Sequence, residues 1–373
     1  MLNNFIQFLV NWRNNLVMSP KFQKWAGNTP LIRVISRRDG EKIYDLMAGF
    51  VYSQTLLALV ELDILIYLKN GSLPIEELSF KTNISKNRMM TLCQSATAIN
   101  LLESSKPAHY SLSRLGAAIL GVPGLVEMIR HHRLFYEDLV DPVKLLKNEA
   151  DTHLSKYWPY VLNGEKKKDI GFDTAGIYSN LMRSSQKLVA EETLRLVSFS
   201  KTKSLLDIGG GTGAFIEEVS VVAPHLSFCL FDLPPVVAKA KKSSLLQAKL
   251  KKIEFCGGSF VTDIIPKGFD TITLIRVIYD HNDEVVFSLL KKVHDALPNN
   301  GRVVISEPMS GGNHPTRSGD SYFGFYTMAM TTGRPRSAEM HKTLLAKAGF
   351  KNIKNYKGTR GFITKVISAE KKL

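Results

Sequence analysis

A glycine-rich segment in the second half of the chain carries the strongest chemical signal. It reads Asp207-Ile208-Gly209-Gly210-Gly211-Thr212-Gly213, after an apolar stretch that predicts a β-strand and before one that predicts a helix. Glycines in such a turn let the backbone bend tightly and let a nucleotide approach without clashing with a Cβ atom. Nineteen residues after Gly213, Asp232 closes the next predicted strand, where a carboxylate can accept hydrogen bonds from both hydroxyls of a ribose. Together these residues predict a nucleotide-binding site.

Asp207 bears on which nucleotide is bound. Gly209, Gly211 and Ala214 also satisfy Gly-x-Gly-x-x-Ala, so a dinucleotide stays open, as does a turn without a ligand. A carboxylate at the entrance of the loop would repel a pyrophosphate but attract the ammonium and sulfonium groups of S-adenosylmethionine. That attraction amounts to about 4 kcal/mol per pair at ~4 Å and an effective dielectric near 20, before desolvation is subtracted. The sequence therefore favours S-adenosylmethionine.

Strands and helices are predicted to alternate from Ser204 onward, which is typical of a parallel sheet flanked by helices. The seven predicted strands lie at 205–208, 228–231, 253–256, 271–275, 303–306, 352–356 and 362–368. The predicted fold class is therefore α/β, with a seven-stranded, Rossmann-like methyltransferase domain at 170–373.

The first half of the chain is predicted to be mainly helical. Helices are expected at 42–68, from 72 and at 85–102, followed by a polar turn and short strand within 103–113 and a helix from Arg114. This order is typical of a winged helix, a fold that often reads DNA. The helix at 85–102 carries only Lys86 and Arg88 among apolar residues, which favours a packing or dimerisation surface over DNA binding. An all-α, winged-helix-like dimerisation domain is therefore expected at 42–165.

Two features mark the end of that domain. A helical stretch at 125–146 is expected to break at Asp141-Pro142, because proline is disfavoured in a helix interior. The polar run at 163–169 is the predicted loop between the two domains.

The chain carries an excess of basic residues. Its 49 Lys and Arg face 34 Asp and Glu, a formal net charge of +15, which favours anionic partners or serves solubility alone. Residues 1–41 form a basic, amphipathic arm that includes Phe8 and Trp12. Such an arm can lie on a membrane surface or pack on its own domain or a second subunit, and both interpretations stay open. No uncharged stretch long enough to cross a bilayer is predicted, so a cytoplasmic protein is expected, with peripheral membrane contact as an alternative.

Cysteine spacing predicts neither a metal site nor a disulfide framework. Cys93, Cys229 and Cys256 lie far apart along the chain without a Cys-x-x-Cys pair, and we interpret them as buried thiols. The adjacent His131 and His132 suit metal binding poorly, because neighbours on a helix point in different directions. No metal is therefore expected.

Four further motifs resemble those of a known family. Segments 231–234, 257–260, 276–283 and 306–309, with the glycine-rich loop, are similar to the plant-type small-molecule O-methyltransferases over about residues 42–368. Segments 47–54, 157–160 and 319–326 look like the bacterial carotenoid-hydroxyl methyltransferases of the demethylspheroidene and hydroxyneurosporene type. The resemblance implies a dimeric, S-adenosylmethionine-dependent enzyme that methylates a hydroxyl of an acyclic carotenoid. A tetrapyrrole or aromatic polyketide methyltransferase, a winged-helix DNA-binding regulator and a nicotinamide oxidoreductase are the competing interpretations.

The resemblance also implies a set of cofactor contacts. They fall on Gly209, Asp232, Leu233, Phe260 and Arg276, with Gln186 on the preceding helix, and they join Asp207, Gly211 and Gly213 of the predicted loop. Ser259 stands where the plant enzymes have an aspartate, so a hydrogen bond at the adenine end is either lost or made by the serine hydroxyl.

The reaction centre departs from the family pattern. Tyr279 takes the place of the general-base histidine, Pro335 replaces one of two flanking carboxylates, and Glu307 keeps the other. A tertiary alcohol is a far weaker acid than a phenol, so we expect the neutral hydroxyl to attack and lose its proton late. Tyr279 would orient that hydroxyl, with Asp280 beside it and His281 or water accepting the proton.

Structural roles remain open for several of these side chains. Asp280 could cap the following helix, His281 could be a surface residue, and Glu307 could pair with a basic group. The aromatic and methionine residues between 322 and 330 are core residues by default. Tyr322, Phe323 and Tyr326 would also suit the wall of a lipophilic substrate tunnel, together with Tyr178 and Met182.

Overall fold

The computed structural model describes residues 2–157, 172–242 and 253–372. The chain divides into two compact units, Met1–Leu120 and Gly121–Leu373. The predicted interdomain loop at 163–169 lies outside the described residues. The division at 120 differs from the expected boundary near 165.

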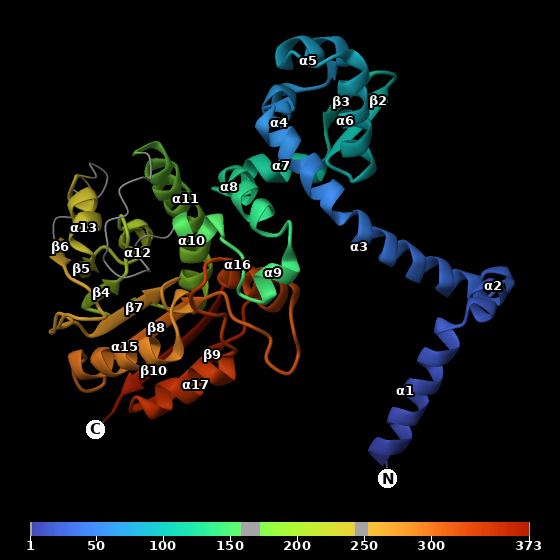
Figure 1. The fold of residues 1–373 in the computed structure, drawn as a ribbon. Helices are drawn as coiled ribbons and strands as arrows, with labels where there is room; N and C mark the ends of the chain where they lie inside the picture. The colour runs from blue at the N-terminus through green and yellow to red at the C-terminus, as the bar shows by residue number, and fades with distance from the viewer. Residues whose placement is uncertain (1, 158–171, 243–252, 373) are drawn as a thin grey trace. The chain divides into compact units, whose positions relative to one another are not determined.

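The second unit contains a seven-stranded sheet with the order β6-β5-β4-β7-β8-β10-β9 (Figure 1). Its strands are β4 (Ser204–Ile208), β5 (Ser227–Asp232), β6 (Ile253–Gly257), β7 (Thr271–Ile275), β8 (Arg302–Glu307), β9 (Phe350–Tyr356) and β10 (Lys365–Lys371). The first five strands pair in parallel, and β10 runs antiparallel to β8 and β9. All seven predicted strands and the α/β fold class are confirmed. The last strand begins at Lys365 because a turn, closed by Ile363 N–H donating to the Arg360 carbonyl, occupies the residues before it.

Helices cover both faces of this sheet (Figure 1). Side chains of α11 (Phe172–Leu196), α12 (Ala214–Val222) and α13 (Pro234–Lys241) form one apolar cluster with the sheet, and those of α15 (Asp283–Ala296) and α17 (Ala338–Lys347) form the other. The central strands are buried on both faces, as in β7, where every residue is buried. Such strands read as unbroken apolar runs, which is why the sequence pattern located them.

The strand order creates a crevice at the carboxyl ends of the central strands. β4 lies between β5, which follows it in the chain, and β7, which comes later. At such a reversal of strand order the connections leave in opposite directions and open a ligand-binding crevice. The ends of β4, β5 and β7 therefore bring Ile208, Asp232 and Ile275 to one edge.

The second unit begins with three helices, α8 (Leu125–Asp138), α9 (Pro142–Leu146) and α10 (His153–Tyr157). The predicted break at Asp141-Pro142 is confirmed, because the Asp141 carboxylate accepts a hydrogen bond from Lys144 N–H and caps α9. Phe135 of α8 and Leu154 of α10 share a core with Tyr326 of α16 (Phe323–Ala329). α16 directly follows the π-helical turn η3 (Arg317–Tyr322). These contacts place α8–α10 with the sheet unit.

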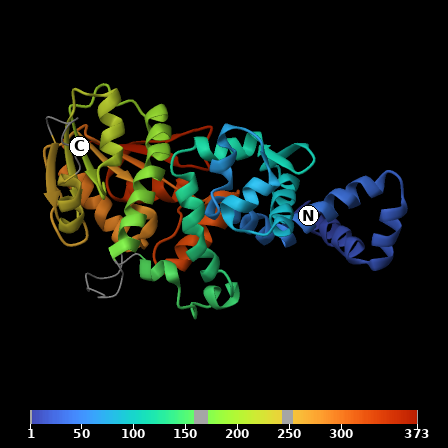
Figure 2. The ribbon, with the colours of Figure 1, turned by 90° about the horizontal axis from the view of Figure 1, so that it is seen from above.

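The first unit combines helices with a small antiparallel sheet of order β1-β3-β2. Its elements are α1 (Leu2–Met18), α2 (Pro20–Asn28), α3 (Ile32–Glu61), α4 (Ile64–Tyr67), η1 (Leu68–Asn70), β1 (Leu73–Pro74), α5 (Ile75–Thr82), α6 (Lys86–Ala98), β2 (Leu102–Lys106), β3 (His109–Leu112) and α7 (Arg114–Gly121). The helical character of this region is confirmed. α3 runs without a break across residue 41, where the arm was expected to end, and both views show α1 and α2 beyond its N-terminal end (Figures 1 and 2).

By length and composition alone, α3 is able to cross a membrane, and it is the only such helix in the part of the chain that the structure describes. Its longest uncharged run, residues 46–60, is about 22 Å long at ~1.5 Å per residue, shorter than the ~30 Å hydrocarbon core of a bilayer. Glycine, serine and glutamine interrupt its apolar pattern but add no charge. At its C-terminal end the helix packs as a core element, with Leu59 and Val60 buried.

Neighbouring strands bring two of the three cysteines together. Cys229 on β5 and Cys256 on β6 have their Sγ atoms 3.3 Å apart, and both are free thiols. Cys93 and Cys229 are buried as expected, whereas Cys256 is only partly buried. Sequence spacing missed this proximity because parallel pairing joins residues that are distant along the chain.

Candidate active site

The glycine-rich loop leaves the end of β4 in a conformation that favours glycine. Gly209, Gly211 and Gly213 have φ values of 68°, 58° and 87°, which other residues rarely adopt. The Gly209 N–H donates to the carbonyl of Phe231 on β5, at 2.8 Å. The loop thus turns tightly between two strand ends, and Gly213 precedes the first turn of α12.

Asp232 ties this loop to the end of β5. One carboxylate oxygen accepts a hydrogen bond from Gly211 N–H at 2.8 Å, and the other accepts one from Leu233 N–H at 2.7 Å. Burial raises the pKa of Asp232, while the two backbone donors act in the opposite direction. Each oxygen keeps a further lone pair, so the carboxylate can accept hydrogen bonds from two vicinal hydroxyls.

Asp207 lies beneath the loop rather than at an open entrance. It is 1% exposed, and its Oδ1 accepts a hydrogen bond from the Thr273 hydroxyl at 2.6 Å. Its Oδ2 is buried without a hydrogen-bond partner among the described residues. Burial raises the pKa of Asp207 to about 7. A buried oxygen of this kind fits a cationic group of a ligand, since an unpaired buried polar atom is costly.

The segment after β6 is held by two side chains that the sequence pattern did not reveal. The Asp263 carboxylate accepts a hydrogen bond from Ser259 N–H at 2.8 Å. Lys292 Nζ donates to the carbonyls of Phe260 and Val261 at 2.9 and 2.7 Å. Asp263 thus places a carboxylate next to Ser259, the position at which the plant enzymes have an aspartate. Its position four residues after the serine is the signal that could have found it.

Phe260 brings this segment next to His281. The two rings meet edge-on with centroids 5.1 Å apart, and burial lowers the pKa of His281 to about 4. His281 is therefore a neutral, largely enclosed side chain, so the interpretation of it as a plain surface residue is wrong.

Tyr279 is enclosed at the centre of the site. It is 2% exposed, and burial together with the adjacent Asp280 raises the pKa of its phenol well above the usual value. Its ring meets that of Phe323 edge-on at 5.9 Å. A phenol in this environment stays protonated, so it can orient a hydroxyl but is a poor proton acceptor.

Two buried carboxyl groups flank Tyr279. Glu307 Oε1 accepts hydrogen bonds from Val277 N–H and Ile278 N–H at 2.7 and 2.9 Å, whereas its Oε2 has no partner among the described residues. Burial raises the pKa of Glu307 to about 7. For Asp280, burial and the Glu307 charge raise the pKa well above its ordinary value. The site thus holds two weakly acidic carboxyl groups. Glu307 accepts hydrogen bonds from backbone amides rather than pairing with a basic side chain, which was the alternative interpretation.

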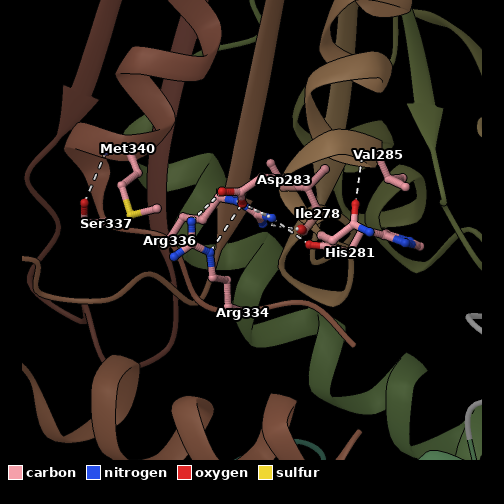
Figure 3. Close-up of polar contacts among 9 residues, drawn as sticks. Ile278, His281, Asp283, Val285, Arg334, Arg336, Ser337 and Met340 are labelled. Carbon is pink, nitrogen blue, oxygen red and sulfur yellow. Dashed lines mark hydrogen bonds and ion pairs between the residues drawn. The ribbon is translucent and has the colours of Figure 1, made fainter. Parts of the chain in front are cut away.

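Asp280 does not cap the following helix. Asn282 does so, because its side-chain oxygen accepts a hydrogen bond from Val285 N–H at 2.9 Å (Figure 3). The helix-cap interpretation of Asp280 is therefore wrong, and its buried Oδ1 lacks a partner in the described part of the chain. Among the described residues, no structural role accounts for this oxygen.

Arg276 joins the sheet to α11 at this edge. Its backbone has φ +57°, a strained value for a residue other than glycine. Its guanidinium donates to the Ser185 hydroxyl at 2.9 Å, and its charge lowers the pKa of Glu307 and of Asp280. Gln186 follows Ser185 on α11 and is partly buried, whereas the side chains of Tyr178 and Met182 lie outside those described.

Arg336 clamps the turn that carries Tyr279, Asp280 and His281 (Figure 3). Its fully buried guanidinium donates to the Ile278 carbonyl at 2.8 Å, the His281 carbonyl at 2.6 Å and the Asp283 carboxylate at 2.7 Å. Gly333 supports the same turn, since a Cβ atom there would lie 2.1 Å from the Tyr279 carbonyl oxygen. The segment around Pro335, which lacks the family carboxylate, therefore holds the backbone of the turn.

An aromatic wall formed by α8, η3 and α16 borders this turn. Tyr322 packs edge-on against Phe323 at 4.9 Å, Phe323 reaches Tyr279, and Tyr322 stacks on Tyr326 at 5.8 Å. Phe135 of α8 meets both tyrosine rings edge-on. The structure thus brings Tyr322, Phe323 and Tyr326 together beside the reaction centre, in a largely apolar surface.

The fold is that of the S-adenosylmethionine-dependent methyltransferases. Human N-acetylserotonin methyltransferase in complex with S-adenosylmethionine shares the fold, with a TM-score of 0.71 at 21% identity over 90% of this chain and 98% of that one. The S-adenosylmethionine-dependent methyltransferase SibL, in its apo form, matches with a TM-score of 0.74 at 19% identity, over 89% and 99% of the two chains.

Within that class, the chain belongs to the O-methyltransferase domain family, whose model matches residues 136–351. It is 44% identical to the demethylspheroidene O-methyltransferase of Rhodobacter capsulatus, over 97% of this chain and 90% of the relative. It is also 44% identical to that of Cereibacter sphaeroides, over 95% and 93%. The expected family, enzyme class and cofactor are thereby confirmed, whereas the roles assigned to individual site residues remain predictions.

Asp207 leads to a prediction about pH. Below about pH 7 its carboxyl group is protonated and cannot attract the ammonium of S-adenosylmethionine, whereas above that pH it is charged. The affinity advantage of the wild-type enzyme over Asp207→Asn should therefore grow from about pH 6 to about pH 8, reaching on the order of tenfold. Calorimetric titration of both proteins measures it. A ratio independent of pH would contradict this role.

Proposed function

We propose that this chain transfers the methyl group of S-adenosylmethionine to the hydroxyl of an acyclic carotenoid. The observation that carries the proposal is the 44% identity, along 97% of the chain, to an enzyme named for demethylspheroidene. The site supports it, because a wall of Phe135, Phe323 and the two tyrosines suits a long apolar substrate. Tyr279 in place of a basic histidine also suits an alcohol that is not deprotonated beforehand.

The residues of the loop and of the neighbouring strand ends would hold the cofactor. Asp207 would face its ammonium, Asp232 its ribose hydroxyls, and Ser259 with Phe260 its adenine, with Gly209, Gly211, Gly213, Leu233, Gln186 and Arg276 completing the contacts. S-adenosylmethionine supplies an electrophilic methyl group on a positively charged sulfur. The enclosed site favours the reaction, because transfer disperses that charge.

Tyr279 would orient the substrate hydroxyl for attack. The turn that carries Tyr279 and Asp280 is fixed by Arg336 and Glu307. Holding oxygen, methyl carbon and sulfur in line can contribute up to about 7–11 kcal/mol in well-oriented systems. Positioning would therefore supply most of the acceleration.

Mass spectrometry tests the proposed substrate. The full-length enzyme is incubated with S-adenosylmethionine carrying a labelled methyl group and a hydroxylated acyclic carotenoid in detergent micelles. We expect one labelled methyl group per modified hydroxyl. Labelling of a tetrapyrrole or an aromatic polyketide offered in the same way, with the carotenoid unchanged, would overturn the proposal in favour of those substrates.

We further propose that the first unit serves assembly, with α3 contributing to a homodimer and α1 contacting a membrane surface. Large apolar side chains on α3 are exposed in the single chain, among them Leu46 and Phe50 at 85% and 70%. On α1, Phe5, Phe8 and Trp12 form an exposed stripe at helical spacing. Residues 1–42 carry seven basic and two acidic side chains. Arg13 is the only charged side chain on α1, and the other six basic residues follow at 21–42. An aromatic stripe next to such a basic segment suits an anionic lipid surface, which would also hold a carotenoid.

Replacing Phe8 and Trp12 together by serine should weaken binding to phosphatidylglycerol vesicles. Removing two inserted aromatic side chains should lower partitioning by about 100-fold or more, at roughly 1.5–3 kcal/mol each. Vesicle co-sedimentation measures the effect, and a variant with serine at Asn4 and Asn11 on the polar face serves as the matched control. Unchanged vesicle binding together with a dissociated dimer in analytical ultracentrifugation would assign the stripe to the subunit contact instead.

A further inference from the structure

The reaction needs a proton acceptor that the turn at 278–281 supplies poorly. Methylating a neutral alcohol gives an oxonium ion, which must lose the original hydroxyl proton. Tyr279 stays protonated, and His281 lies edge-on against Phe260. Asp280 and Glu307 are both buried, and a negative charge on Glu307 disfavours a negative charge on Asp280. An acceptor from another element would complete the site.

Helix α8 presents two adjacent histidines to the aromatic wall, each paired with a tyrosine. His132 Nε2 lies 2.6 Å from the Tyr322 hydroxyl, and His131 Nε2 lies 2.9 Å from the Tyr326 hydroxyl. Adjacent residues on a helix point in different directions, yet here each reaches its own tyrosine because the two tyrosine rings stack four residues apart. The wall thus contains two histidine–tyrosine pairs of equal chemistry.

The two pairs differ in what they can reach. His131 and Tyr326 are buried, at 8% and 5% exposure, whereas His132 and Tyr322 are only partly buried. Tyr322 meets Phe323 at 4.9 Å, and Phe323 in turn meets Tyr279 at 5.9 Å. The His132–Tyr322 pair therefore lies one ring away from the residue that would orient the substrate hydroxyl, on the side that remains accessible.

We propose that Tyr322 and His132 accept the proton that the substrate hydroxyl loses on methylation. In this step the alcohol oxygen forms a bond to the methyl carbon, and the carbon–sulfur bond breaks with its electron pair remaining on sulfur. The hydroxyl proton passes to the Tyr322 oxygen as the phenol proton moves to His132 Nε2. One positive charge thus leaves sulfur and arrives on imidazolium, which later releases the proton to water. This inference rests on the proposed function.

The electrostatics of the pair agree with this role. Burial lowers the pKa of His132 to about 4, so near neutral pH its imidazole is uncharged and able to accept a proton. A protonated ether is a far stronger acid than imidazolium, so the transfer stays downhill. Burial raises the pKa of Tyr322, so the phenol relays the proton rather than losing it. At His131, the neighbouring His132 and the Arg276 charge further oppose protonation.

The test compares His132→Gln with His131→Gln in the full-length enzyme, using the hydroxylated carotenoid and labelled S-adenosylmethionine. We expect kcat of His132→Gln to fall by roughly 100-fold, with KM and the calorimetric affinity for S-adenosylmethionine nearly unchanged. His131→Gln occupies the same helix and loses the same kind of hydrogen bond, so it measures the loss caused by disturbing the wall, and its kcat should fall far less than that of His132→Gln. Full activity in His132→Gln, or an equal loss of kcat in both variants, would overturn the assignment.

Tyr322→Phe provides a second test that preserves the ring packing. It should lower kcat as His132→Gln does, with an unchanged melting temperature, and wild-type turnover in this variant would contradict the relay. A wild-type enzyme that leaves the carotenoid unmethylated would overturn the proposed function together with this inference. A wild-type enzyme that methylates it, with His132→Gln equally fast, would overturn this inference alone.

Discussion

Replacing Asp232 by alanine should weaken the binding of S-adenosylmethionine by about 100-fold to 1,000-fold. The carboxylate would lose its hydrogen bonds to the two ribose hydroxyls, and hydrogen bonds to charged groups are worth roughly 1.5–3 kcal/mol each. Gly211 N–H and Leu233 N–H would also lose their acceptor, so the loop would be held less firmly before the cofactor binds. Calorimetric titration of the full-length enzyme measures the affinity.

Asp138 provides a matched control for this variant. Its carboxylate is also buried, and it also accepts hydrogen bonds from two backbone amides, those of His153 and Leu154, but at the start of α10. Asp138→Ala should therefore lower the melting temperature without changing the affinity for S-adenosylmethionine. An unchanged affinity in Asp232→Ala would remove Asp232 from the cofactor site, and equal losses in both variants would assign the effect to stability.

The arrangement of the candidate cofactor residues could be predicted from the sequence because these residues are local. Asp207 and the glycines lie in one turn, and Asp232 ends the next strand, so a pattern along the chain contains the geometry. The central strands were found for a related reason, since burial on both faces leaves unbroken apolar runs. The pattern did not predict how deeply the Asp207 side chain is buried. It lies beneath the loop, and one of its carboxylate oxygens has no partner among the described residues.

The reaction half could not be predicted in the same way, because its contacts join distant segments. Arg336 binds a turn more than fifty residues earlier, and the partners of His131 and His132 lie about 190 residues later. The adjacent histidines were weighed only as metal ligands, for which their divergence counts against them. The fold uses that same divergence to reach two different tyrosines. A lone arginine or histidine carries no sequence signal of such a partner.

The domain boundary shows the same limit. Composition placed it at the polar run near 165, but packing assigns α8–α10 to the sheet unit. Phe135 and Leu154 are apolar residues whose partner, Tyr326, comes much later in the chain. Because the aromatic wall is built on α8 and α16, this assignment places the wall in the same compact unit as the glycine-rich loop.

Replacing Arg336 by methionine should lower both kcat and stability. The variant would remove the guanidinium donor from the Ile278 and His281 carbonyls and one of the two guanidinium partners of Asp283. Depriving a buried carbonyl of a hydrogen-bond donor costs about 1–3 kcal/mol. Because Tyr279 and Asp280 lie between the two released carbonyls, their positions should loosen and kcat should fall. KM and the affinity for S-adenosylmethionine should change little, because Arg336 contacts neither the glycine-rich loop nor Asp232.

Arg334→Met tests whether losing an ion pair with Asp283, without losing hydrogen bonds to the carbonyls of the turn, is enough to cause these effects. Arg334 also pairs with Asp283, but its side chain is 53% exposed and its guanidinium binds neither carbonyl of the turn. We expect Arg334→Met to keep most of the stability and turnover, since exposed ion pairs contribute only about 0–1 kcal/mol. Arg336→Lys should restore part of kcat, because an ammonium group can reach one of the three acceptors but cannot match the planar fork. Denaturant unfolding and steady-state kinetics, both measured where every variant is folded, distinguish these cases. If Arg336→Met were as stable and as active as Arg334→Met, the turn would be held by Glu307 and Gly333 without the guanidinium.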